Sequence, residues 1–541
     1  MRRDFAIAAL LPIASLMVLW PALSADLYAD DYFFIALARR AASPVDYFTT
    51  EHFFGGYLYR PIPMAIWWFF EHYAGGAYPQ YVCNALLLGT SGASLYWVLR
   101  ELAWTRSWAL AMALLYVWLP ANISTSLWLA DRFDLAAVTC MLAAIALWLR
   151  FVRAGGAAAA SGVLALFAVT ALSKELSYLV PLVLGLALVA NWNERNRGFA
   201  KAGLRAHISL IAGCGVLLVA ILLWRAHIGI ALAPPSTAGN GLLTTMLYGT
   251  VKWWRFLPAA LVFTRAPAAD MSPWLSVLLA TGCLAVAIIG WRASGGGSNE
   301  GFQRRLGISL GVAILLLTPV VQAPHLTVVD IAFAAQDGVM GGMFVERFYF
   351  FGWTGLLLAV GNGIAAVAPQ RDAAVRRKLA AAAMSVCVLS AAWCLVRDST
   401  ITAGWPRKTN QTVRVADAAV ESALGRLPDG EMPCTLRFLN SGDGLFQAAG
   451  EAMIKVIAAR PEVDRCIIET EGPPMFTLTD SSAFARYTLE EAGATLKVVR
   501  FAGWIIIPGV LVRRIDPAHT RVYAFDPATG KFNVIDPPGA K

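Results

Sequence analysis

Eleven apolar runs divide the first 396 residues of the chain, with short polar or basic segments between them. Most of them approach the roughly 20 residues that a helix needs to cross a bilayer. The runs cover residues 5–23, 79–99, 107–120, 127–149, 160–172, 175–191, 207–226, 273–291, 307–322, 348–367 and 379–396. This pattern predicts a polytopic α-helical membrane protein whose transmembrane domain, with about 11 transmembrane helices, covers residues 1–396.

The fifth and sixth runs decide the direction of everything after them. Residues 160–172 are few for a membrane span, so we expect this run and 175–191 to form two helices joined by a tight turn at residues 173–175. The alternative is one long helix over residues 160–191. That alternative would invert every later span.

Basic residues predict the orientation of the spans. With the N-terminus inside, the clusters of Arg and Lys that separate alternate spans all fall on the cytoplasmic side, as the positive-inside rule requires. The clusters are Arg2 and Arg3; Arg100 and Arg106; Arg150 and Arg153; Arg195, Arg197, Lys201 and Arg205; Arg292, Arg304 and Arg305; and Arg371, Arg376, Arg377 and Lys378. The predicted location is a cell inner (plasma) membrane, with residues 397–541 outside the cytoplasm.

Two of the predicted outer loops are long and rich in aromatic residues. The loop over residues 24–78 carries many Tyr, Phe and Trp side chains, which suit helices that lie in the membrane interface. In the loop over residues 227–272, the segment 242–263 is similar, and it forms either an interfacial helix or a twelfth span.

The composition changes after residue 396. Helical patterns over residues 411–426, 444–459 and 482–492 alternate with strand-like runs over 435–439, 466–469, 496–499 and 504–507. Residues 397–541 are therefore predicted to form a small extracytoplasmic α/β domain. Its two cysteines, Cys434 and Cys466, form either a disulfide or two free thiols, whereas the other six lie in or beside spans and suit apolar packing.

The overall composition agrees with a membrane protein. The 541 residues are 58% hydrophobic and only 15% charged, with a mean hydropathy of +0.59. A soluble domain averages about 25% charged residues. The net charge of +9 does not indicate a nucleic-acid partner, because the basic residues stand in short clusters between apolar runs.

Two adjacent carboxylates, Asp30 and Asp31, follow the first apolar run. Charged groups at the end of a membrane helix are costly, so we interpret this pair as the centre of an extracytoplasmic active site. A helix cap is the alternative for one of them, because Tyr32 to Arg40 has the pattern of a short helix. A metal site that adds Glu51 and His52 is conceivable, although their spacing matches no known metal motif.

Several basic residues lie on the predicted outer face, although the positive-inside rule favours basic residues on the cytoplasmic side. They suggest binding of an anionic group such as a lipid phosphate. They are Arg39, Arg40, Arg60, Arg132, Lys174, Lys252, Arg255, Arg265 and Arg347. The alternatives are side chains that reach lipid headgroups and, for Arg132, Lys174 and Arg347, structural ion pairs with neighbouring acids.

The ordered set of short motifs resembles the GT-C superfamily of integral-membrane glycosyltransferases, and in particular the protein O-mannosyltransferase-like enzymes. The stretches that carry the resemblance are Asp30-Asp31, Tyr59-Arg60-Pro61-Ile62 (family YRPL), Asn84 with Leu86 to Leu88 (N-x-LLH), Asp131 to Leu135 (GR-x-[DE]-LL), Leu172-Ser173-Lys174-Glu175 (LSKE) and Glu346 to Phe350 (ER-x-LYLP). Gly89 stands where the family often has His, and the Leu-Pro of the last motif is absent. The resemblance covers residues 1 to about 396 but does not extend to the tail.

The resemblance implies transfer of a sugar from a polyprenyl-phosphate donor to an extracytoplasmic hydroxyl, with inversion at the anomeric carbon. Asp30 is expected as the base and Asp31 as its partner or alternate. The expected phosphate binders are Arg60, Lys174, Arg132 and Arg347. The expected sugar, acceptor or lipid contacts are Tyr59, Glu175 and Tyr349, with packing as the alternative role for both tyrosines. No metal ligand is assigned, and a divalent metal stays open as a cofactor.

The expected partners are the lipid-linked donor, a protein or glycolipid acceptor, and the bilayer. A transporter or flippase for a lipid carrier is the first alternative function, and an O-antigen ligase-like protein is the second. A transporter would place charges at mid-membrane, whereas here they cluster on one predicted face. The glycosyltransferase interpretation requires Asp30, Arg60 and Lys174 to come together in space.

Overall fold

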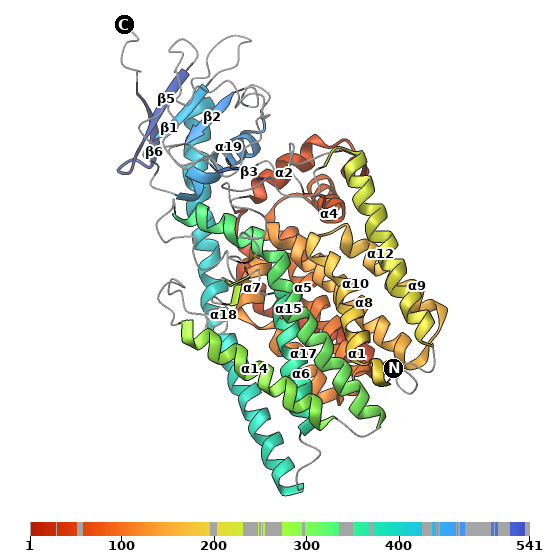
Figure 1. Cartoon of the computed structure of the whole chain (residues 1–541). Coiled ribbons are helices and arrows are strands. Elements are labelled where there is room, and N and C mark those ends of the chain that lie inside the picture. The colour runs from red at the N-terminus through yellow and green to blue at the C-terminus, as the bar shows by residue number, and fades with distance from the viewer. Residues whose placement is uncertain are drawn as a thin grey trace.

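The computed structural model describes most of the membrane domain and the core of the C-terminal domain. The described ranges are 2–28, 30–50, 58–194, 203–230, 273–294, 298–334, 350–367, 373–424, 435–439, 444–460, 466–470, 499–501, 504–506 and 520–535, together with residues 247, 250, 251, 253, 254, 441 and 463. Figure 1 shows a helical bundle with a small mixed α/β unit at one end.

The bundle contains helices of very different length. In chain order they are α1 (Arg2–Leu19), η1 (Trp20–Ser24), α2 (Asp31–Arg40), α3 (Asp46–Thr49), α4 (Pro61–Tyr73), α5 (Ala77–Glu101), α6 (Arg106–Val117), α7 (Pro120–Leu127), η2 (Leu129–Asp131), α8 (Arg132–Ala154), α9 (Ala157–Ala171), η3 (Glu175–Leu179), α10 (Val180–Ala190), η4 (Trp192–Glu194), α12 (Leu204–His227), α14 (Pro273–Ala293), α15 (Asn299–Ala334), α17 (Phe350–Val367) and α18 (Ala373–Leu424). Those labelled η are 3₁₀ helices.

Within the described residues, six helical segments are long and apolar enough to cross a membrane. They are Arg2–Ser24, Ala77–Glu101, Leu129–Ala154, Leu204–His227, Asn299–Gln322 and Phe350–Val367. A seventh is added if α6 and α7, which are bent by 51° at the break between them, count as one span. Each of the eleven predicted runs falls on a helix, but the predicted count of about 11 spans is not confirmed.

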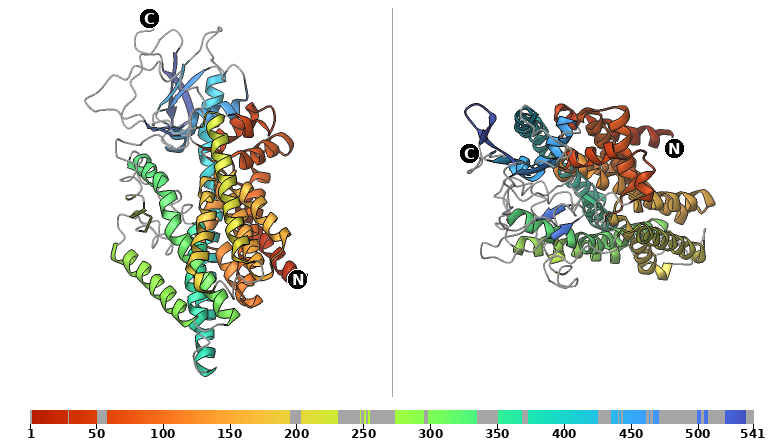
Figure 2. Two further views of the ribbon diagram at one scale, coloured as in Figure 1. Left: turned by 45° about the vertical axis from the view of Figure 1, so that its right-hand side comes forward. Right: turned by 90° about the horizontal axis from the view of Figure 1, so that it is seen from above.

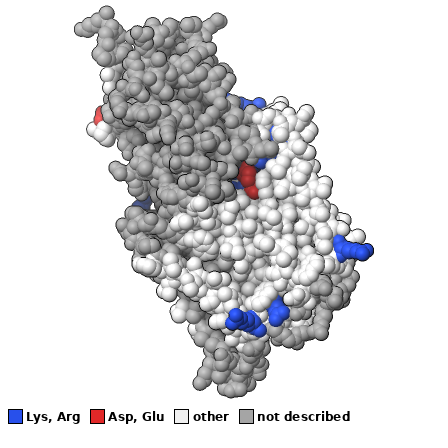
Figure 3. Space-filling model, in the orientation of Figure 1, with Lys and Arg blue, Asp and Glu red and all other residues white. Residues whose placement is uncertain are grey.

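The surface of the bundle suits a bilayer. Val216, Leu223 and Leu278 are exposed by 69%, 67% and 68%, and soluble proteins do not expose large apolar patches of this kind. Among the described residues on the face drawn in Figure 3, a band without charged side chains separates Lys and Arg near the lower and right-hand edges from charged groups above. The chain is therefore a membrane protein with two polar ends.

Residues 160–191 form two helices, as the sequence predicts. α9 ends at Ala171, residues 172–174 make a turn, and η3 and α10 continue the chain. The turn is closed by backbone hydrogen bonds from Ser173 N and Lys174 N to Thr170 O. The hydroxyls of Thr170 and Ser177 lie 2.8 Å apart across it. The single long helix is thereby excluded.

Gly89 lets α5 and α1 approach each other closely. A Cβ atom at this position would lie 2.3 Å from Pro12 Cα and 2.8 Å from Leu11 O. Membrane helices pack through small residues in this way, because van der Waals contact between backbones replaces the hydrophobic driving force. The departure from the family pattern at Gly89 therefore has a packing reason, since a histidine would collide with α1.

The loop over residues 24–78 forms short helices at one end of the bundle, as the sequence predicts. α2 lies beside the C-terminal unit (Figure 1), and α4 packs against α2. α3 precedes the stretch 51–57, which lies outside the described residues. Trp68 of α4 donates its indole N–H to Ala41 O at 3.0 Å, which joins α4 to the end of α2.

The opposite end of the bundle is held by ion pairs around Asp4. Arg100 Nε and Arg106 Nε both lie 3.0 Å from Asp4 Oδ1. Arg153 lies 3.0 Å from Glu101 at the end of α5. This end carries basic residues that the sequence pattern assigns to the cytoplasm.

The C-terminal unit contains a four-stranded sheet with the order β2-β1-β5-β6. The strands are β1 (Thr435–Leu439), β2 (Ile467–Thr470), β5 (Thr520–Asp526) and β6 (Lys531–Ile535), and β3 (Val499–Phe501) pairs with β4 (Trp504–Ile506) as a separate hairpin. β1 is parallel to β2 and β5, whereas β6 is antiparallel to β5. Helix α19 (Gly444–Ala458) connects β1 to β2, which gives a βαβ unit.

Aromatic side chains fill the core between this sheet and its helices. Phe438 stacks on Tyr523 with ring centroids 5.1 Å apart, and Phe532 meets Phe438 edge-on at the same distance. The sequence predicted β1, β2, β4 and α19 closely, but it missed β5 and β6. Residues 482–492, where it predicted a helix, lie outside the described residues.

Helix α18 joins the two parts of the molecule. It runs without a break through residue 396, where the sequence predicted the boundary between the domains. The upper part of α18 lies beside the sheet (Figure 2). Thr409 of α18 accepts a hydrogen bond from Asp26 N at 3.2 Å. Arg39 of α2 donates to Val456 O of α19 at 2.8 Å, so the C-terminal unit contacts the membrane domain directly.

Cys466 is disulfide-bonded. Cys434, the partner that the sequence suggested, lies outside the described residues. Cys83, Cys140, Cys214, Cys283 and Cys394 are free, and Cys214 and Cys394 are buried, which agrees with the apolar packing predicted for cysteines in spans.

Candidate active site

The acidic pair lies where the first span turns into α2, and both carboxylates are buried. Asp30 is 2% exposed and Asp31 is fully buried. Asp30 occupies the position before the first turn of α2, but its side chain forms no cap hydrogen bond to that helix. Its Oδ1 instead accepts a hydrogen bond from the indole N–H of Trp128. The helix-cap alternative for Asp30 is therefore not what the structure shows.

Asp31 connects two segments of backbone. Its Oδ2 accepts from Tyr28 N and its Oδ1 accepts from Ala130 N, both at 2.9 Å. Backbone donors at both oxygens fix the orientation of this carboxylate and join α2 to the turn between α7 and α8. Burial, together with the neighbouring charge of Asp30, raises the pKa of Asp31 well above its ordinary value.

Arg132 begins α8 and is fully buried beneath aromatic rings. Its Nε donates to Asn84 Oδ1 at 2.9 Å and its Nη2 to Gln80 O at 3.2 Å. Its guanidinium carbon lies 4.4 Å from the ring centre of Trp67. The sequence suggested an ion pair with Asp131 or Asp134, but the hydrogen bonds of this guanidinium instead join α8 to α5.

Lys174 and Glu175 each pair with a residue distant in sequence. Lys174 forms an ion pair with Asp134. Arg60 donates to Glu175 Oε2 from Nε at 3.0 Å and from Nη2 at 2.7 Å. All four side chains are mostly buried, at 13% exposure or less. The sequence placed Lys174 beside Glu175, whereas the structure gives each of them a different partner.

Phe133 packs between α2, which begins at Asp31, and Arg60. Its ring meets Phe34 of α2 with centroids 5.0 Å apart, and the guanidinium carbon of Arg60 lies 5.1 Å from its ring centre. Residues 128–134 therefore contact both aspartates on one side and both basic residues, Arg60 and Lys174, on the other. We call residues 128–134 the α7–α8 turn. Four of the other motif stretches that carry the resemblance meet around it.

Tyr59 is a packing residue in this structure. It is 1% exposed, and its hydroxyl donates to Phe48 O at 3.1 Å. Burial raises the pKa of this phenol. Trp224 of α12 donates to the same carbonyl at 2.7 Å, so Tyr59 fixes the loop before α4. This agrees with the packing alternative.

Some of the predicted site residues lie outside the described residues. They are Arg347, Tyr349, Glu51, His52, Lys252, Arg255 and Arg265. Of the other outer basic residues, Arg39 pairs with Glu71 at 2.7 Å. In the part of the chain that the structure describes, no group of three or more His, Cys, Asp or Glu side chains is placed to hold a metal ion.

The sequence did not predict that Trp128 and side chains of α18 lie near the acidic pair. Trp128 has no motif signal, because it stands before the motif over residues 131–135. Lys408 of α18 lies 5.2 Å from the ring centre of Tyr28, and Trp405 donates to Tyr81 at 2.9 Å. Tyr81 in turn donates to Asp26 O at 2.9 Å. Only the folded chain brings α18 beside the segment that carries Asp30 and Asp31.

No protein-family model and no curated protein matches the chain. Among solved structures, the archaeal oligosaccharyltransferase AglB from Archaeoglobus fulgidus, in complex with an inhibitory peptide and a dolichol-phosphate, is similar with a TM-score of 0.44 and 11% identity over 99% of this chain and 74% of that one.

Two further structures of the Archaeoglobus fulgidus oligosaccharyltransferase are similar at the same identity, 11%. The complex with Zn and sulfate has a TM-score of 0.42 and covers 84% of this chain and 61% of that one. The form tethered to an acceptor peptide with the NVT sequon has a TM-score of 0.43 and covers 84% and 63%. A likeness at this level does not say which residues react.

Proposed function

We propose that this protein is a membrane glycosyltransferase that moves a sugar from a polyprenyl-phosphate donor to a hydroxyl group of an extracytoplasmic acceptor. The observation that carries the proposal is the arrangement around the α7–α8 turn, where two buried carboxylates and two basic residues meet at one end of an apolar helical bundle. Sugar transfer from a phosphate leaving group needs both kinds of group, a base for the acceptor and cations for the phosphate.

Asp30 is the proposed base. It takes the proton of the acceptor hydroxyl while the hydroxyl oxygen attacks the anomeric carbon and the bond from that carbon to the phosphate oxygen breaks. The phosphate departs with the bonding electron pair, so it needs no general acid. One displacement of this kind inverts the configuration at the anomeric carbon. The indole N–H of Trp128 orients the Asp30 carboxylate for this step.

Asp31 is proposed as a positioning residue. Both of its oxygens accept backbone N–H groups, so it fixes the start of α2, and with it Asp30, against the α7–α8 turn. Its second effect is electrostatic. The negative charges of two adjacent buried carboxylates repel each other. This repulsion raises the pKa of the pair above that of an isolated aspartate, so the pair is a stronger base.

Arg60 and Lys174 are the proposed phosphate binders. An ammonium group has three N–H donors and a guanidinium group has five, so each is able to hold its carboxylate partner and a phosphate oxygen together. Glu175 and Asp134 then hold the cations in place. Arg132 is buried under Trp67, and its proposed role changes from phosphate binding to positioning of α8. The roles of Arg347 and Tyr349 stay predictions.

The test compares carboxamide variants of the purified, reconstituted protein. Asp30→Asn and Asp31→Asn are assayed for sugar transfer with a panel of polyprenyl-phosphate sugars and candidate protein and glycolipid acceptors. Asp30→Asn removes the proposed general base and is expected to lower kcat by about 10²–10⁴-fold. Glu71→Gln is the matched control, since this carboxylate lies on α4 and pairs with Arg39 away from the α7–α8 turn.

Two results would overturn the proposal. The first is transfer by Asp30→Asn at the rate of the wild type. The second is a wild type that moves lipid carriers across vesicle membranes while transferring no sugar with any donor, which is the behaviour of the transporter alternative.

A further inference from the structure

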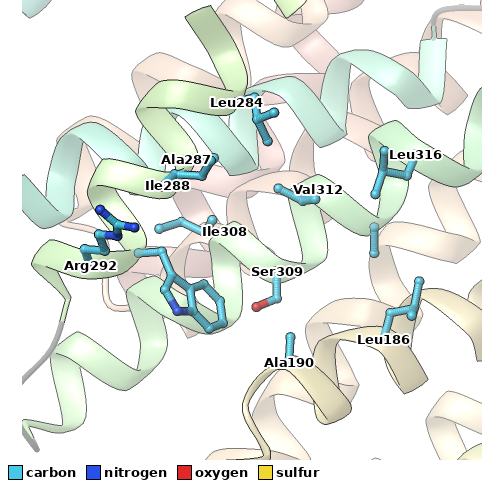
Figure 4. Close-up of a pocket in the computed structure, with 12 residues that line it drawn as sticks. Leu186, Ala190, Leu284, Ala287, Ile288, Arg292, Ile308, Ser309, Val312 and Leu316 are labelled. Carbon is cyan, nitrogen blue, oxygen red and sulfur yellow. The ribbon is translucent and has the colours of Figure 1, made fainter. Parts of the chain in front are cut away.

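A cavity of about 410 Å³ lies between α10, α14 and α15. This volume falls in the usual range of ligand sites, about 300–1,000 Å³. Figure 4 shows its lining, which is almost entirely aliphatic. Side chains from three helices contribute, among them Leu186 of α10, Ile288 of α14 and Val312 of α15.

The cavity is a groove on the outside of the bundle. Three of its lining residues, Leu186, Leu284 and Leu316, are exposed by 46%, 54% and 59%. Exposed apolar side chains that gather in one groove favour contact with hydrocarbon over contact with water. The groove therefore opens toward the bilayer, and a lipid chain is the occupant that its lining suits.

One end of the groove is basic. Arg292 lies there (Figure 4), and the preceding residue, Trp291, also belongs to the lining. The guanidinium carbon of Arg305 lies 5.8 Å from the ring centre of Trp291, so a second cation stands beside the same indole. Tryptophan and arginine side by side are typical of the headgroup region of a membrane. A lipid in this groove thus places its phosphate beside Arg292, with the guanidinium group of Arg305 near the same indole.

This basic end lies at the opposite end of the bundle from the acidic pair. Arg304, next to Arg305, lies with its guanidinium 3.5 Å from Ala103 O, in the turn after α5. Gln80, near the start of the same helix, contacts Arg132 beside the α7–α8 turn. The helix α5 has 25 residues, which span about 37 Å at 1.5 Å per residue. A sugar attached to a phosphate at Arg292 is therefore out of reach of Asp30.

We propose that the groove between α10, α14 and α15 binds an anionic phospholipid of the leaflet on the Arg292 side. One acyl chain fills the aliphatic groove, and the phosphodiester contacts Arg292. Charge complementarity selects an anionic headgroup, and the distance from the acidic pair separates this site from any donor site. The inference does not depend on the proposed enzymatic function.

The test measures lipid binding to the full-length protein by native mass spectrometry in detergent. Phosphatidylglycerol is titrated against phosphatidylcholine with the same acyl chains and, in a third arm, against a polyprenyl phosphate. The wild type is expected to bind phosphatidylglycerol more tightly than phosphatidylcholine. Arg292→Gln is expected to weaken phosphatidylglycerol binding about fivefold and to leave phosphatidylcholine binding unchanged.

Ala190→Phe fills the groove from an exposed lining position and is expected to remove the tightest phosphatidylglycerol site. Val189→Phe is its matched control, because Val189 is the adjacent residue of α10, is 64% exposed and does not line the groove. Arg3→Gln removes one exposed charge at the same end of the bundle and controls for net charge.

Retention of the tightest site in Ala190→Phe overturns the proposal, and so does equal binding of phosphatidylglycerol and phosphatidylcholine by the wild type. Tighter binding of the polyprenyl phosphate than of phosphatidylglycerol by the wild type, lost in Ala190→Phe, would show that the groove takes a different lipid and would also overturn the proposal. Gel filtration of each variant confirms that it is folded before lipid is added.

Discussion

The indole N–H of Trp128 donates a hydrogen bond to the carboxylate of Asp30, although the two residues are 98 positions apart in the chain. Both groups are buried, at 1% and 2% exposure. A hydrogen bond to a buried charged group contributes about 1.5–3 kcal/mol. This contact therefore stabilises one orientation of the carboxylate proposed to act as the base.

Trp128→Phe is expected to lower kcat by about 10–100-fold, the equivalent of that hydrogen bond, with little change in KM. The ring volume is nearly kept, so the loss reports the missing donor. Steady-state kinetics with the best donor measures it. Trp148→Phe is the matched control, because Trp148 is fully buried in α8 and its indole nitrogen has no partner among the described residues. Equal kcat and KM values in both variants would contradict a role for Trp128 in orienting Asp30.

Asp31 is expected to make stability depend on pH. Its folded-state pKa is raised above the ordinary value of 3.8, so the folded protein binds the proton more tightly than the unfolded chain does. The stabilisation by this proton is complete below the unfolded pKa and is lost as the pH rises through the folded pKa. The Tm of the wild type minus that of Asp31→Asn should therefore fall as the pH rises from about 4. A difference that stays constant or increases with pH would contradict this expectation.

Variants of Arg60 and Glu175 distinguish a structural role of Arg60 from a role in phosphate binding. Arg60→Gln leaves a buried carboxylate without its partner, which is expected to cost about 3–5 kcal/mol of stability. Arg60→Gln combined with Glu175→Gln should recover a large part of that stability, because the unpaired charge is gone. Thermal unfolding of the two single variants and the double variant measures the coupling.

If Arg60 also binds phosphate, the double variant regains stability but not transfer activity. The KM for the donor then stays raised in Arg60→Gln and in the double variant, whereas Glu175→Gln alone has a smaller effect. Recovery of activity together with stability would assign the pair a structural role only.

Gly89→Ala is expected to lower stability by about 1–3 kcal/mol, the usual range for overpacking. The added Cβ would stand 2.3 Å from Pro12 Cα, and backbone atoms do not move aside easily. Gly185→Ala is the matched control in another helix of the bundle, since a Cβ there meets nothing within 4 Å. It should be neutral or stabilising by about 0.5–1 kcal/mol, because alanine favours helix. Unfolding in detergent compares the two variants.

Reporter fusions test the orientation of the bundle. A fusion after residue 192 is expected to give a cytoplasmic signal, and one after residue 400 an extracytoplasmic signal. Asn191 lies 2.9 Å from Ser309 near the basic end, whereas Thr409 contacts Asp26 at the end with the acidic pair. Two signals on the same side of the membrane would contradict this arrangement.

The local patterns of the sequence were sufficient to place most elements. Each of the eleven apolar runs falls on a helix, and the turn at residues 173–175 interrupts residues 160–191 as predicted. The number of spans did not follow from hydropathy. α9 and α10 are short, and α6 and α7 meet at a bend, so the length of an apolar run does not say whether its helix crosses the membrane.

By itself, the sequence determined which residue types stand at the ends of which helices. It showed an acidic pair after the first span and basic residues in predicted outer loops, since hydropathy and motif spacing are local properties of the chain. Only the tertiary structure decided the partners. Lys174 pairs with Asp134 and Glu175 pairs with Arg60, although Lys174 and Glu175 are neighbours in sequence. The physical reason is that ion pairs depend on how separate helices pack, and no local pattern encodes that packing.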